Sequence, residues 1–92
     1  MDNFENINPV YRIEADKLVK GLIENGIEFD YYKCWDGVQV CCDEWDVICN
    51  SGSYGHERGL LEVMGTIARP VGNYVEGYLT AEEILQRLNL TI

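Results

Sequence analysis

This sequence of 92 residues contains no hydrophobic run close to the ~20 residues that a membrane-spanning helix needs. It also contains neither a GxGxxG motif nor a P-loop, the glycine-rich patterns that bind nucleotide phosphates. The first residues, MDNFENINP, include no basic and no apolar segment, so the sequence predicts no signal peptide. We therefore expect one domain, residues 1–92, located in the cytoplasm, where thiols stay reduced.

Positively charged residues are scarce. The chain has 7 Lys and Arg against 16 Asp and Glu, which gives a net charge of −9 at pH 7. An acidic surface repels nucleic-acid backbones and anionic membranes, so the sequence predicts neither as a partner. It is compatible with a protein partner that has a basic surface. The simpler alternative is that the charge only keeps a small protein in solution.

The stretch IEFDYYKCWDGVQVCCDEWDVICN, residues 27–50, predicts three antiparallel strands. Apolar and polar residues alternate through it, and Asp36-Gly37 between two such runs is a strong hairpin signal. A turn at Asp36-Gly37 would pair Trp35 with Val38. A second turn at residues 43–44 would pair Val40 with Val47.

Because side chains alternate along a strand, this register divides the meander into two faces. The face expected in the core includes Ile27, Phe29, Trp35, Val40 and Val47. The other face is expected to be acidic and partly wet, and it carries Glu28, Asp30, Tyr32, Asp43 and Asp46.

Two helices flank the meander. Asn8-Pro9 is a typical helix start, apolar residues follow at helical spacing, and Asn25-Gly26 ends the helix. Thr80-x-x-Glu83 is a capping box that begins a C-terminal helix. Residues 60–64 favour a strand, with a helical turn as the alternative, and residues 74–78 favour another strand. Residues 1–7 are expected to form a flexible arm. The sequence thus predicts an α+β fold, an antiparallel meander of three to five strands with both helices packed on one face.

Four cysteines raise the question of zinc. Their spacing is Cys34-x6-Cys41-Cys42-x6-Cys49, not the short C-x2–4-C pairs of structural zinc sites. The predicted register puts Cys34 and Cys41 on one face and Cys42 and Cys49 on the other, so the four cannot bind one ion. We expect structural thiols, no metal and no cofactor. A regulated disulfide between Cys34 and Cys41 is the alternative.

The loop SGSYGHERG, residues 51–59, is the most site-like segment. Its glycines and small hydroxyl residues can turn backbone N–H groups toward an anion. The simpler interpretation is a surface loop that needs glycine for its turns. His56 is the only histidine, and neighbours in sequence do not make a catalytic triad, so we predict no enzyme. The candidate anion site comprises Ser51, Gly52, Ser53, Tyr54, Gly55, His56 and Arg58.

Four segments together carry a resemblance: CWDG (34–37), SGSYG (51–55), GLLEVMG (59–65) and VEGYLTAEE (75–83). The chain from about residue 27 onward resembles small proteins encoded by phages and prophages of gut Firmicutes. No activity is established for those proteins, so the resemblance assigns no site residues. It implies a bacterial cytoplasm, a mobile element and action on the host.

Two functions of different classes follow. The first is a non-enzymatic binding protein of a phage or mobile element that binds a host protein with a basic surface; inhibition of a host defence protein is its specific form. Exposed aromatic side chains within an acidic rim suit such an interface, and its residues would be Glu28, Asp30, Tyr32, Trp35, Asp43 and Asp46. The alternative is binding of a small anionic ligand, such as a nucleotide, in the loop of residues 51–59.

Overall fold

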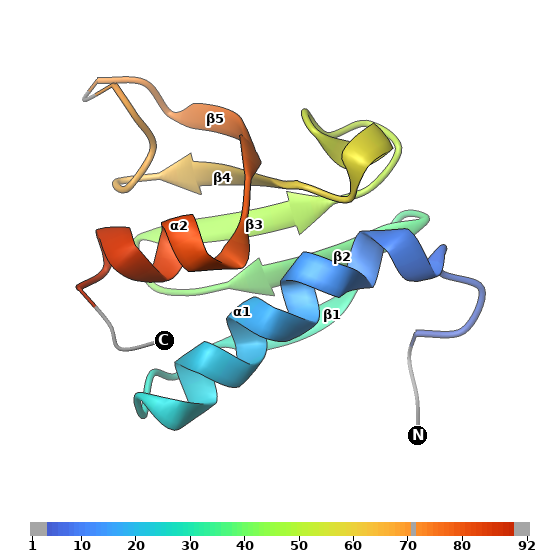
Figure 1. The fold of residues 1–92 in the computed structure, drawn as a ribbon, viewed down its shortest axis with the longest axis horizontal. Helices are drawn as coiled ribbons and strands as arrows, with labels where there is room; N and C mark the ends of the chain where they lie inside the picture. The colour runs from blue at the N-terminus through green and yellow to red at the C-terminus, as the bar shows by residue number, and fades with distance from the viewer. Residues whose placement is uncertain (1–3, 71, 90–92) are drawn as a thin grey trace.

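The computed structural model describes residues 4–70 and 72–89. Five antiparallel strands form one sheet in the order β1-β2-β3-β4-β5, and both helices cover the same face of that sheet (Figure 1). The elements are η1 (Pro9–Arg12), α1 (Ile13–Glu24), β1 (Asp30–Cys34), β2 (Gly37–Cys41), β3 (Trp45–Cys49), η2 (His56–Arg58), β4 (Leu61–Gly65), β5 (Val75–Leu79) and α2 (Ala81–Arg87). The predicted α+β meander is confirmed, with five strands, and the ambiguous apolar run is strand β4.

The N-terminal helix begins and ends at the predicted residues. The side chain of Asn8 accepts the N–H of Val10 at 3.0 Å, and Pro9 opens a 3-10 turn that continues into α1. At the other end Gly26 has a φ of 69°, and the N–H of Ile27 donates to the carbonyl of Leu22 at 3.0 Å. This left-handed glycine with its backward hydrogen bond is a Schellman motif, which explains why the helix stops there.

The C-terminal helix is held by its predicted capping box and by close packing on α1. Thr80 accepts the N–H of Glu83 at 3.2 Å, and Glu83 accepts the N–H of Thr80 at 2.9 Å. A side-chain carbon added to Gly21 would lie 2.5 Å from Cδ1 of Leu85. Gly21 therefore lets the two helices approach each other, which offsets its low helix propensity.

Apolar residues from the sheet and from both helices form one core. The helix-facing side of the sheet contributes side chains with at most 1% exposure, namely Val38, Val40, Val47, Cys49, Leu61 and Val63. Helices α1 and α2 bury Leu18, Leu22 and Ile84 against them. The alternation that predicted the core face therefore reflects burial of one side of the sheet.

The first hairpin turn differs from the predicted one. Trp35 and Asp36 form the turn and Cys34 pairs with Gly37, so the predicted pairing of Trp35 with Val38 is wrong. A Cβ on Gly37 would lie 1.8 Å from the carbonyl oxygen of Cys49, so strand β2 needs glycine at this point. The register shifts by two residues, and the side chains within the paired strands keep their faces because strands have a period of two.

Two further expectations change at the edges of the sheet. Trp35 leaves the core face and is 76% exposed, since it lies in the turn rather than in the strand. Of the arm expected over residues 1–7, residues 1–3 lie outside the described residues, and the part from Phe4 onward contacts the rest of the fold. The Phe4 ring lies 4.7 Å from the ring of Tyr31 and under the guanidinium of Arg12, and Ile7 joins the core.

In the described residues, no helix has the length and apolar character needed to cross a membrane.

Candidate functional site

The sheet face turned away from the helices is named here the open face. Pairing across the strands places on it Asp30, Tyr32, Cys34, Gln39, Cys41, Asp46, Ile48, Glu62, Met64 and Val75. None of these residues is basic, and several are apolar or aromatic. The open face therefore combines negative charge with exposed apolar surface, which is a composition that protein interfaces also use.

One corner of this face gathers four of the acidic residues predicted as partner contacts. Asp30, Cys41 and Asp46 lie opposite one another across β1, β2 and β3. Glu28 and Asp43 line the same depression as Asp30, which has a volume of about 620 Å³ and includes both Cys41 and Cys42. This group is called the acidic corner: Glu28, Asp30, Asp43 and Asp46.

None of the four carboxylates of the acidic corner forms an ion pair in the part of the chain that the structure describes. Burial, together with the nearby charges of Asp43, Asp30 and Asp46, raises the pKa of the Cys42 thiol to about 11. The Cys42 thiol therefore stays protonated at neutral pH.

The other two predicted partner contacts lie outside this corner. Tyr32 occupies the next row of the open face, opposite Gln39, and is 39% exposed. Tyr32 therefore lies beside the acidic corner, near Cys41 and Asp46, rather than at its centre, because the register of β1 is shifted by two residues. Trp35 lies at the opposite end of β1, in the turn.

The cysteines occupy the faces that the alternation predicted. Cys49 is buried in the core, and Cys42 is partly buried and packs against that core. All four thiols are free. The alternative of a Cys34–Cys41 disulfide is contradicted. Cys41 pairs with Asp30, four residues from Cys34 along β1, so the two lie ~13 Å apart, beyond the reach of a disulfide. Among residues 4–70 and 72–89 no three His, Cys, Asp or Glu side chains are placed to hold a metal ion.

The loop of residues 51–59 connects β3 to β4 and uses its backbone N–H groups within the fold. Asp36 accepts the N–H of Ser51 at 3.0 Å, and Glu62 accepts the N–H of Tyr54 at 2.8 Å. The N–H of Gly52 donates to the side chain of Asn50 at 2.8 Å. The N–H groups of four further loop residues donate to backbone carbonyls: Ser53, His56, Arg58 and Gly59.

The charged side chains of this loop do not converge on an anion site. Nδ1 of His56 lies 3.4 Å from the hydroxyl of Tyr11, and the two rings pack edge to face. Gly55 is buried and packs on Tyr78 and Leu60, and Arg58 is exposed. Two acceptors of the loop, Asp36 and Glu62, are themselves carboxylates, so the geometry gives the anion hypothesis little support.

Glu62 lies on the open face opposite Ile48 of β3, and the sequence did not indicate its burial. Its side chain is 6% exposed, because the loop folds over it and Tyr54 packs on Gly77 of β5. A Cβ on Gly77 would lie 2.3 Å from Cβ of Tyr54. The loop is therefore fastened to the end of the sheet by Glu62 and by contact with β5.

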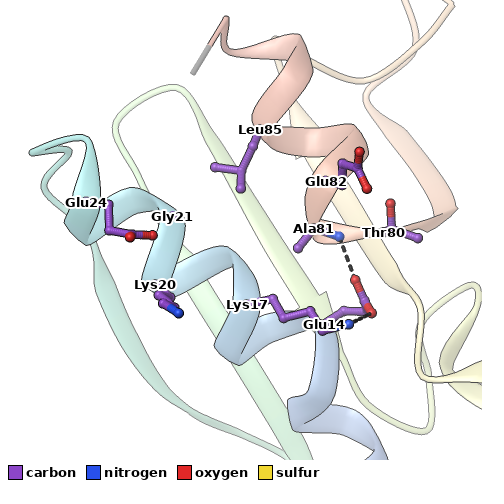
Figure 2. A pocket seen from close by; sticks show the side chains of 9 residues that line it. All are labelled: Glu14, Lys17, Lys20, Gly21, Glu24, Thr80, Ala81, Glu82 and Leu85. Carbon is purple, nitrogen blue, oxygen red and sulfur yellow. Dashed lines mark hydrogen bonds and ion pairs between the residues drawn. The ribbon is translucent and has the colours of Figure 1, made fainter. Parts of the chain in front are cut away.

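A groove between the two helices was not indicated by the sequence. It lies between α1 and the start of α2 (Figure 2) and has a volume of about 360 Å³. Glu14 lies across its mouth, accepting the N–H of Ala81 at 2.8 Å and pairing with Lys17 at 3.2 Å. Leu85 points from α2 toward Gly21 (Figure 2). Glu14 thus joins Lys17 of α1 to the first turn of α2, so the groove forms part of the seam between the helices.

Neither a protein-family model, nor a curated protein, nor a solved structure matches this chain.

Proposed function

We propose that this protein is a non-enzymatic binding protein whose acidic corner contacts a basic surface on another protein. The observation that carries the proposal is the gathering of Glu28, Asp30, Asp43 and Asp46 around Cys41 and Cys42 without an ion pair among the described residues. Like charges gathered in one place repel one another. A partner with Lys and Arg at its surface would remove that repulsion.

The surroundings of the acidic corner favour a protein as the partner. Beside the carboxylates, the open face exposes Tyr32, Ile48, Met64 and Val75 in whole or in part. Apolar surface next to charge supplies both affinity and orientation, because burial of apolar area stabilises the complex and charge selects and steers the partner. A small cation would use only the charge.

The setting of this proposal is the cytoplasm of a bacterium, with the gene carried by a phage or another mobile element. The resemblance of the chain from about residue 27 onward supports that setting. In its specific form the proposal is that the protein inhibits a host defence protein by covering a basic surface. Binding of a nucleotide in the loop of residues 51–59 is the weaker alternative, since most N–H groups of that loop donate within the fold.

The test is capture from a lysate of the host bacterium with two charge-matched double variants. Asp30→Lys with Asp43→Lys reverses the acidic corner, and Glu24→Lys with Glu82→Lys reverses two exposed carboxylates on the helices. Each variant changes the net charge from −9 to −5, because every reversal adds two charges.

We expect wild type and the helix variant (Glu24→Lys with Glu82→Lys) to capture a basic protein from the lysate. The corner variant (Asp30→Lys with Asp43→Lys) should no longer capture it. Equal retention by all three would leave the acidic corner as a solvated surface without a binding role. Thermal unfolding serves as the control for folding: the corner variant should be as stable as wild type or slightly more stable, since repulsion is relieved.

A further inference from the structure

The tip of the first hairpin carries a tryptophan that neither the turn nor the core requires. Trp35 is 76% exposed, and its φ of 61° lies in the left-handed region, which is strained for a bulky residue. Glycine or asparagine would form such a turn at lower cost. The ring lies over Gly52, where an added Cβ would be 3.0 Å from Cζ3 of Trp35, but most of it faces solvent. Strained residues of this kind cluster at binding sites.

The ring borders a shallow depression with a fixed negative charge beside it. This depression, of about 260 Å³, is lined by Trp35, Asp36 and Ser51 and is named the Trp35 hollow. Asp36 is held by the N–H of Ser51 at 3.0 Å, and the hydrogen bonds from Ser51 lower the pKa of this carboxyl. Among the described residues no Lys or Arg forms an ion pair with Asp36. An aromatic ring and an ionised carboxylate thus line the same hollow.

We propose that the Trp35 hollow anchors one arginine side chain of the basic partner protein. The inference rests on the proposed function and adds a second contact, at the opposite end of β1 from the acidic corner. A guanidinium is planar, so it can stack on an indole ring while it donates hydrogen bonds to a carboxylate. A lysine ammonium is a compact, strongly hydrated charge that does not stack in this way. Tryptophan and arginine are also the residues that most often dominate interface energetics.

The experiment compares hexa-arginine and hexa-lysine peptides as probes, by calorimetry at low salt. Trp35→Asn removes the ring and suits the positive φ, so this variant should unfold at the same temperature as wild type or higher. Asp36→Asn removes the charge and retains an oxygen that can accept from Ser51. The controls are Tyr74→Asn, an aromatic residue 79% exposed beyond the other end of the sheet, and Glu82→Gln, which removes one charge elsewhere.

Wild type and both controls should bind hexa-arginine about fivefold or more tightly than hexa-lysine, as a cation–π contact of about 1 kcal/mol provides. Trp35→Asn should bring that ratio close to one, and Asp36→Asn should lower it. Equal binding of both peptides by wild type, or an unchanged ratio in Trp35→Asn, would overturn the arginine anchor.

The double reversal of Asp30 and Asp43 separates this inference from the proposed function. If it weakens both peptides while the arginine preference is absent, the acidic corner stands and the Trp35 hollow does not. If the double reversal weakens neither peptide, the acidic corner loses its support. The arginine preference of wild type then decides on the Trp35 hollow separately.

Discussion

Replacing Gly37 by alanine should destabilise this fold far more than the same substitution at Gly26, the glycine that ends α1. Gly37 opens β2 opposite Cys34, and a Cβ there would lie 1.8 Å from the carbonyl oxygen of Cys49 and 2.8 Å from Cα of Asn50. Both atoms belong to the backbone, so no side-chain rotation can relieve the clash. The strands β2 and β3 must separate at this end instead.

The size of the effect follows from the cost of overpacking. Inserting a methyl group into a packed site costs roughly 1–3 kcal/mol, and a backbone clash at Gly37 puts Gly37→Ala near the upper end, about 3 kcal/mol. For a domain of this size that lowers Tm by roughly 12–24 °C. Gly26→Ala is the matched control, because Gly26 has a φ of 69° and an added Cβ meets no atom within 4 Å. It should lose only about 1 kcal/mol, from backbone strain.

Urea unfolding followed by circular dichroism measures both variants on one scale. A loss below about 0.5 kcal/mol for Gly37→Ala, the range of an ordinary surface change, would mean that Gly37 does not lie against the end of β3. The turn would then not be at Trp35 and Asp36, and the assignment of the hairpin register would have to be abandoned.

Native Cys42 and Cys49 should react slowly with a thiol reagent at pH 8, because burial above all raises the pKa of each thiol to about 11. Mass spectrometry can compare labelling of the native protein with labelling in denaturant, and rapid labelling of both thiols in the native protein would refute the prediction. Arg87 donates to both oxygens of Glu76 and lowers the pKa of Glu76, so this stabilisation is complete above the ordinary glutamate pKa and lost as the pH falls through the lowered value. Glu76→Gln should therefore cost about 1–2 kcal/mol at pH 7, a difference that denaturation curves should show shrinking as the pH falls below the ordinary glutamate pKa. Nucleotides and phosphate should leave Tm unchanged, because the N–H groups of residues 51–59 are largely occupied; a shift that Arg58→Ala abolishes would favour the anion hypothesis instead.

Local patterns predicted the faces of the sheet better than they predicted its turns. Alternation assigned Val40 and Val47 to the core and Asp46 to the open face, since burial of one side imposes a period of two. The Asp36-Gly37 pair predicted the wrong turn, because its glycine serves a contact with the end of β3 rather than a positive φ. Such a contact joins residues distant in the sequence, and no local signal reports it.

The candidate site shows the same limit. The sequence grouped the acidic residues of the meander, and they do lie together, but around Cys41 and Cys42 rather than Tyr32. The glycine-rich loop resembled an anion cradle because its acceptors, Asp36 and Glu62, lie outside the segment. Hydrogen bonds between distant residues decide whether a backbone N–H group is free for a ligand.

The most direct test of the acidic corner is the association rate of the captured partner, measured as a function of salt. For wild type and for Glu24→Lys with Glu82→Lys, the rate should be similar and should fall steeply as the salt concentration rises, because the charges on the corner steer the encounter. For Asp30→Lys with Asp43→Lys, the rate at low salt should be at least about tenfold lower and nearly independent of salt. If the corner variant associates at the wild-type rate with the wild-type dependence on salt, the partner does not bind through the acidic corner.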